Sequence, residues 1–267
     1  MGSEMCIRDR VDSGQFDNYR RQLGVLYNAA DKPTLARRVF GDILDDVPAD
    51  SWEGKSVRKK LIAMDSRAVA LRGRADAWLS SGKHKNAIAD YEEALLLNEK
   101  LLELQDAEGL RKLIRVDDGA LNNLAWVLAT SPKEELRDGE RAIELAKKAA
   151  EATDYEEAHI LSTMASGYAE TGDFEKAIEW VEKAQELNVI QSNKPDNDKA
   201  RTDKQKASLA KELESYKKEE PWREIQDVEN ESKKKKDDNG SDQSDAEDEK
   251  DDDEKDDEDK DDEEDKK

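Results

Sequence analysis

The 267-residue sequence has few of the residues that build β-rich or disulfide-bonded domains. Aromatic residues make up 5% of it, and it contains 13 glycines, 5 prolines and one cysteine, Cys6. Sandwiches and barrels have many tight turns rich in glycine and proline, so this composition favours helices. A single cysteine excludes a disulfide framework within the chain.

Long apolar runs and an excess of positive charge are also absent. Runs such as LLLN at residues 95–98 are far too short to span a bilayer, so we expect no membrane insertion. The formal net charge is −22. Because binding to phosphates depends on basic surface that releases counterions, we expect no nucleic-acid partner.

The first ten residues, MGSEMCIRDR, lack the apolar segment of a secretory signal. They resemble peptide translated from sequencing-adaptor read-through, so we expect residues 1–10 to be non-native. On this interpretation the true start is missing, together with any signal peptide and any earlier repeats. The compartment would then be the cytoplasm or, if a signal peptide was lost, an extracytoplasmic space.

Four stretches of the sequence share one spacing of small and large apolar residues. In the clearest copy, Ala165 and Ala177 stand where two antiparallel helices approach too closely for larger side chains, and Gly172 and Asp173 turn the chain between them. The expected units, within a solenoid over residues 11–190, are residues 17–48, 68–101, 118–151 and 158–190. Between them lie helix-compatible insertions at 49–67 and 99–116, which we interpret as lengthened second helices or short extra ones.

This spacing is similar to that of the tetratricopeptide repeat. The stretch LNNLAWVLATSP and the ending SYKKEEPWREIQ also resemble the C-terminal half of bacterial multi-repeat tetratricopeptide proteins, over roughly residues 17–226. The resemblance implies an all-α superhelix of antiparallel helix-turn-helix units. It implies architecture alone, because most such proteins have no assigned biochemical role.

The region after the repeats divides into two parts. Residues 191–226 are predicted to form a polar linker and an amphipathic helix that caps the last unit, with Trp222 folding back as a plug. That helix is expected over about 198–219. The side chains expected to face the repeats are Ala207, Leu209, Ala210, Leu213 and Tyr216. Residues 227–267 are predicted to be a disordered acidic tail, because ordering a residue costs about 1–2 kcal/mol and almost nothing apolar is available to bury.

Catalytic and metal-binding patterns are missing from the sequence. Neither His84 nor His159 has a second histidine or cysteine at ligand spacing, and the acidic stretch 237–249 lacks the ligand order of an EF-hand. There is no phosphate loop, because Gly82-Lys83 has no earlier glycine at the required offset, and there is no G-x-S-x-G. We therefore expect neither an enzyme nor a cofactor.

In tetratricopeptide folds the first helices of the units line a concave groove. The positions that would face it predict partner contacts at Arg21, Gln22, Arg72, Asp76, Asn122, Asn123, Trp126, His159, Thr163 and Ser166. Arg21 and Arg72 would supply positive charge, the two asparagines would bind a peptide backbone, and Trp126 would be the apolar anchor. The alternative for Trp126 is packing against a helix formed by residues 99–116.

The family's two-carboxylate clamp for chaperone C-termini provides a more specific comparison. The clamp positions correspond here to Arg72, Asp76, Asn123, His159 and Thr163. Asp76 would repel a carboxylate, so chaperone-tail binding is not expected.

We therefore predict a scaffold that binds a peptide or a protein segment in its groove. Two alternatives stay open. The chain could be the regulatory or scaffold end of a larger protein with an upstream catalytic domain. It could also be a chaperone-like protein whose acidic tail attracts basic partners.

Overall fold

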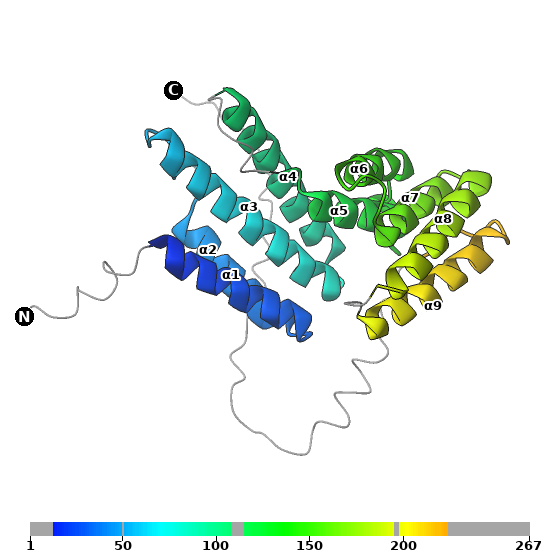
Figure 1. The fold of residues 1–267 in the computed structure, drawn as a ribbon. Coiled ribbons are helices and arrows are strands. Elements are labelled where there is room, and N and C mark those ends of the chain that lie inside the picture. Colours follow the sequence, from blue (N-terminus) through cyan, green and yellow to red (C-terminus); the bar gives the residue numbers. More distant parts are fainter. Residues whose placement is uncertain (1–12, 50, 108–114, 195–197, 224–267) are drawn as a thin grey trace, which may run out of the picture. The chain divides into compact units, whose positions relative to one another are not determined.

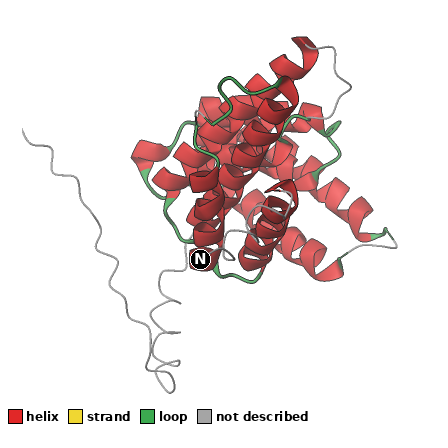
Figure 2. Ribbon diagram, turned by 90° about the vertical axis from the view of Figure 1, so that its left-hand side faces the viewer, coloured by secondary structure: helices red, strands yellow, loops and turns green. Residues whose placement is uncertain are grey.

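The computed structural model describes residues 13–49, 51–107, 115–194 and 198–223 (Figure 1). In these ranges the chain forms nine α-helices, one short 3-10 helix and no strand, which Figure 2 shows from a second side. The predicted all-α fold is confirmed. The predictions for residues 1–10 and 227–267 lie outside the described residues.

Consecutive helices pair along the chain. The first four pairs are α1 (Ser13–Ala29) with α2 (Pro33–Asp46), α3 (Val57–Ser80) with α4 (His84–Ala107), α5 (Asp118–Thr130) with α6 (Gly139–Ala152), and α7 (Ala158–Glu170) with α8 (Phe174–Ser192). The longer turn between α5 and α6 contains the 3-10 helix η1 (Glu134–Leu136). A final helix, α9 (Lys199–Tyr216), packs mainly on α8 and also touches α7.

Local sequence explains where several helices begin and end. Four of them start after an aspartate whose carboxylate accepts a hydrogen bond from a backbone N–H in the first turn; these caps are Asp117, Asp138, Asp173 and Asp198. After α3 and α7 the chain turns at Gly82 and Gly172, with φ of 73° and 82°. Glycine adopts this left-handed conformation without the strain a side chain would add, so the next helix can fold back.

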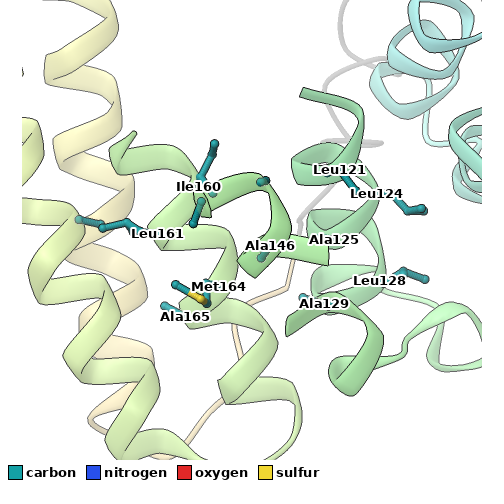
Figure 3. Close-up of a cluster of buried hydrophobic side chains, with 14 of the residues drawn as sticks. Leu121, Leu124, Ala125, Leu128, Ala129, Ala146, Ile160, Leu161, Met164 and Ala165 are labelled. Atoms are coloured by element: carbon teal, nitrogen blue, oxygen red, sulfur yellow. The ribbon is translucent and has the colours of Figure 1, made fainter. Parts of the chain in front are cut away.

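The core consists of two clusters of buried side chains. One joins α2, α3 and α4, and the other extends from the end of α3 to α9. The repeat spacing that places Ala165 and Ala177 at a helix crossing predicts four further crossing alanines, and all six are fully buried; these are Ala75, Ala87, Ala125, Ala142, Ala165 and Ala177. Figure 3 shows part of the second cluster, where Ala146 of α6 lies between the labelled residues of α5 and α7.

The first unit uses glycine rather than alanine for its closest approach. Phe40 of α2 is fully buried and lies against Gly24 of α1 and Gly73 of α3. A Cβ atom at Gly24 would be 2.5 Å from Phe40 Cζ, and one at Gly73 would be 2.3 Å away. The two glycines therefore make the space that the phenylalanine ring fills.

One of the seam positions in this unit was predicted wrongly. In this unit the repeat spacing predicts that Leu23 fills the seam between the paired helices, yet Leu23 is 41% exposed. Among the described helices, α1 packs mainly against α2 and α3, which leaves the Leu23 side chain partly in solvent.

The first insertion was also interpreted wrongly. It does not lengthen the second helix of its unit, because α2 ends at Asp46 and Pro48 follows, which disfavours helical conformation at Val47. Residues from Val57 onward instead lengthen α3 to 24 residues. The second insertion begins as a lengthened α4, also 24 residues, whereas α5 has 13; residues 108–114 of that insertion lie outside the described ranges.

The last helix packs on the fold with a face that differs in part from the predicted one. Leu209 and Tyr216 are buried as expected, and Trp222 is partly buried against the second core cluster. Ala207 and Ala210 are exposed, whereas Thr202 and Glu212 are buried. The apolar residues alone were a poor guide, because the buried face of α9 is partly polar. None of the helices in the described ranges has the length and hydropathy of a membrane span.

Candidate functional site

Side chains of α5, α7 and α9 meet around a hollow of about 280 Å³. We call it the α5–α7–α9 hollow; it is lined by Asn122, Asn123, Trp126, His159, Ser162, Thr163, Gln205, Ser208, Leu209 and Glu212. The hollow forms because α5 and α7 occupy equivalent places in successive units and α9 follows them. Five of the ten predicted contact residues therefore come together: Asn122, Asn123, Trp126, His159 and Thr163.

Trp126 forms part of the wall of this hollow. Its side chain is half-buried, and it belongs to neither of the two core clusters. The indole is therefore placed on the α7 and α9 side, rather than packed in the core. The anchor role of Trp126 stays a prediction, and so does the alternative of packing against residues 99–116, of which 108–114 lie outside the described ranges.

The two asparagines of α5 differ in their hydrogen bonding. Asn122 is 7% exposed, and its Nδ2 donates to Asn123 Oδ1 at 3.1 Å. The Oδ1 atom of Asn122 is buried and accepts no hydrogen bond within the described structure. A buried amide oxygen without a donor is unfavourable, so this atom is a ready acceptor for a ligand.

Asp76 holds Asn123 in place but does not line the hollow. Its Oδ1 accepts hydrogen bonds from Asn123 Nδ2 at 3.0 Å and from the Tyr91 hydroxyl at 2.6 Å. Burial raises the pKa of Asp76, and the two hydrogen bonds offset part of that rise. Asp76 therefore connects α3, α4 and α5.

The most buried charged group in the hollow is Glu212 of α9, which is 1% exposed. Its Oε2 accepts from Ser162 Oγ at 2.6 Å and its Oε1 from Ser208 Oγ at 3.0 Å. Burial raises the pKa of Glu212, and the two serine hydrogen bonds act in the opposite direction. No lysine, arginine or histidine forms an ion pair with it in the described part of the chain.

Sequence reasoning missed Glu212 and its neighbours Gln205 and Ser208. Their spacing of three and four residues places them on the same side of a helix as Leu209 and Tyr216. That spacing was the available signal. It was passed over because only apolar residues were assigned to the packed face.

Of the three predicted contacts on α7, two line the hollow and one does not. His159 lines the hollow, and burial lowers its pKa, which favours the neutral imidazole. Thr163 also lines it and donates to the His159 carbonyl at 3.1 Å. Ser166 does not line it: its Oγ donates to the Ser162 carbonyl at 3.1 Å and lies 3.0 Å from the Tyr216 hydroxyl. The capping helix therefore covers Ser166, which the prediction had left open to a partner.

The predicted positive contacts do not line this hollow. Arg21 lies 3.5 Å from Asp65, and Arg72 Nη1 lies 2.9 Å from Oδ1 of Asp117, the residue that caps α5. Gln22 is exposed on α1. The two arginines thus stabilise contacts between neighbouring elements, and the lining of the hollow contains no lysine or arginine.

A second hollow, of about 650 Å³, lies between α4, α5 and α6. Its lining includes the exposed side chains of Leu96 and Val116. Charged residues also line it, and two of them, Arg141 and Glu92, form an ion pair at 2.7 Å. Across the described residues, neither hollow nor any other region groups three potential metal ligands.

Two parts of the chain match a protein-family model described as tetratricopeptide repeat, namely residues 74–101 and 158–188. These matches cover the end of α3 with most of α4, and α7 with most of α8. No curated protein sequence matches the chain.

Two similar solved structures come from Podosopora anserina. Both are described as "putative kinesin light chain nearly identical TPR-like repeats", and the description of one of them also names a substitution. Each is 15% identical with a TM-score of 0.44; the alignments cover 79% and 78% of this chain and 97% of each of the others. The chain thus contains tetratricopeptide repeats, matched at 74–101 and 158–188, within an array of paired helices.

Proposed function

We propose that this protein is a non-enzymatic interaction module that holds an extended segment of a partner protein in the α5–α7–α9 hollow. Tetratricopeptide repeats generally bind other proteins along the surfaces that their stacked units create. The partner is therefore a protein or peptide, and no step of the function requires a cofactor.

The observation that carries this proposal is the convergence of polar and aromatic side chains from three helices on one hollow. Asn122, Asn123 and Gln205 offer amides, which can both donate to and accept from a peptide backbone. Trp126 offers a large apolar surface of the kind that contributes much of the binding energy in protein interfaces.

A selection from a phage-displayed library of random peptides tests the proposal. Peptides enriched on the wild-type protein are measured by fluorescence anisotropy against wild type and Trp126→Ala. We expect Trp126→Ala to weaken binding about tenfold or more, as for a residue at the centre of an interface. The substitution should leave the fold intact, because Trp126 belongs to neither core cluster.

The matched control is Leu96→Ala, which removes an exposed apolar side chain from the second hollow. Binding of the selected peptides to this variant should stay within about twofold of wild type, as for most surface substitutions. Peptides that lose affinity for Leu96→Ala but not for Trp126→Ala would contradict the proposal and place the site between α4, α5 and α6.

A further inference from the structure

We propose that the α5–α7–α9 hollow selects a partner segment that inserts a lysine or arginine side chain, whose cationic group is received by Glu212 and by Asn122 Oδ1. This assignment of ligand class rests on the function proposed above, and it names the chemical group that the hollow prefers.

The first support is the carboxylate of Glu212, which is buried without a cation. Removing a carboxylate from water is costly, and two hydrogen bonds from neutral hydroxyls offset only part of that cost. Each oxygen can accept more than one hydrogen bond, and each accepts one from a serine here. A cation entering the hollow would supply both the missing donors and the missing charge.

The second support is independent of the first and comes from α5. Asn122 lines the same hollow and is 7% exposed. Its Oδ1 atom is buried and accepts no hydrogen bond within the described residues. One of the two N–H donors of the Asn122 amide is bonded to Asn123, and Oδ1 is the acceptor that lacks a donor. An ammonium group has three donors and a guanidinium group five, so either can satisfy an amide oxygen and a carboxylate together.

The rest of the lining is compatible with a long cationic side chain. Trp126 and Leu209 provide apolar surface for the methylene stem, and an indole face also attracts cations. No lysine or arginine lines the hollow, and burial lowers the pKa of His159, so the lining offers no fixed positive charge. A partner carboxylate would instead be repelled by Glu212.

Small probes test the charge preference directly. The probes are Nα-acetyl-lysine methylamide and Nα-acetyl-arginine methylamide, with the neutral Nα-acetyl-norleucine methylamide as their matched control. Each is titrated into the full-length protein while NMR follows the Trp126 indole N–H signal. We expect saturable shifts with both cationic probes, and affinity for the norleucine probe weaker by about tenfold or more, as for a charge-assisted hydrogen bond that is lost.

The matched variants are Glu212→Gln and Glu214→Gln, on the same helix. Glutamine at 212 keeps the size of the side chain and removes its charge. Glu214 is exposed and pairs with Lys218, so its replacement leaves the hollow unchanged. Glu212→Gln should weaken binding of the cationic probes about fivefold or more, whereas Glu214→Gln should change it less than about twofold.

A second measurement needs no variant and guards against misfolding of Glu212→Gln. The carboxyl carbon resonance of Glu212 in the wild type should move with the lysine probe and stay in place with norleucine. Equal response to lysine and norleucine, or no response to either cationic probe, would overturn the proposal.

The phage selection distinguishes failure of the cation preference from failure of the proposed peptide-binding function. Peptides that depend on Trp126 but lack lysine and arginine, and that bind Glu212→Gln unchanged, would leave a peptide-binding hollow without a cation preference. Selected peptides that ignore Trp126 altogether would remove both proposals.

Discussion

Single residues decide how closely the helices of this protein approach one another. The alanines at the crossings are fully buried, so a larger side chain at these positions has no solvent to extend into. Extra methylene groups in a well-packed core force neighbouring side chains and backbone to move. The size of these residues, rather than their hydrophobicity, is therefore the property that the fold requires.

Ala87→Leu and Ala177→Leu are each expected to lower the free energy of unfolding by about 1–3 kcal/mol because of overpacking. Chemical denaturation by guanidinium chloride measures the effect. Ala207→Leu is the control: this alanine is exposed on α9, so its substitution should change stability by less than about 0.5 kcal/mol. Crossing variants as stable as the control would show that the helices do not meet at these alanines.

Glu212 gives the stability of the protein a pH dependence. Burial raises its pKa in the folded state above that of an unfolded glutamate, so the folded state binds more protons between the two values. The free energy of unfolding should therefore fall as pH rises through that window. Burial also raises the pKa of Asp65 and Asp76, which adds to the same trend.

Glu212→Gln should make the fall in stability as the pH rises above about 4 shallower, because glutamine does not ionise. Denaturant melts across this range compare the wild type, Glu212→Gln and the exposed-site control Glu214→Gln. Parallel stability curves for wild type and Glu212→Gln would show that the raised pKa contributes nothing to folding.

The crossing alanines could be predicted from sequence, whereas Glu212 could not. An alanine at a fixed position of the repeat has the same environment in every unit. One repeat spacing therefore predicts the burial of all the crossing alanines. The burial of a glutamate depends on Ser162 and Ser208, and only the packed structure brings Ser162 of α7 to α9. Similarly, Arg21 and Arg72 were expected to be free because their partners, Asp65 and Asp117, lie more than forty residues away in sequence.

At the scale of helices, the contact of α1, α2 and α3 depends on two glycines around one ring. Phe40 is enclosed by Gly24 and Gly73, so its ring has no room to move away from an added Cβ atom. Alanine has a higher helix propensity than glycine by about 1 kcal/mol. The predicted clash at these two positions outweighs that gain.

Gly73→Ala is expected to destabilise the protein by about 1–3 kcal/mol, as for other overpacked sites. Gly41→Ala is the matched control, because a Cβ atom there meets nothing within 4 Å and Gly41 is inside α2. This control should stabilise the protein by about 0.5–1 kcal/mol through helix propensity. Thermal and denaturant melts that shift in the same direction for both variants would contradict the close contact.

The helices themselves were predictable where repeat spacing and turn residues agreed. The insertions were harder to predict, because a helix-forming composition does not tell which of the two neighbouring helices the insertion extends. For residues 49–67 the deciding feature is Pro48, which follows the end of α2 and leaves the later residues to α3. For α9, the buried face could not be predicted from apolar residues alone, because that face contains Thr202 and Glu212.

At the scale of the whole molecule, charge is the dominant property. The net charge is −22, and residues 231–267, with 21 acidic residues and 9 lysines, contribute about −12 of it. Long-range attraction between opposite charges raises association rates and is screened over about 8 Å at physiological salt. A cationic partner segment should therefore associate quickly at low salt.

Deleting residues 228–267 should lower the association rate constant of a lysine-containing selected peptide at low salt, while its dissociation rate constant stays the same. Glu212→Gln should mainly raise the dissociation rate constant, because it removes a contact made in the complex. Stopped-flow mixing from about 0.05 M to about 0.3 M salt separates the two effects. A large rise in dissociation on deletion would instead support the alternative in which the acidic tail is the binding surface.

The unequal lengths of the helical units restrict how this array could be rebuilt from its parts. At 1.5 Å per residue, α3 and α4 run about 16 Å further than the 13-residue α5. Their additional turns bury Met64, Leu97 and Leu101 in the cluster that contains α2. Shuffling or duplicating the units as equal modules would leave those side chains in water, so the order of the units is part of what the sequence encodes.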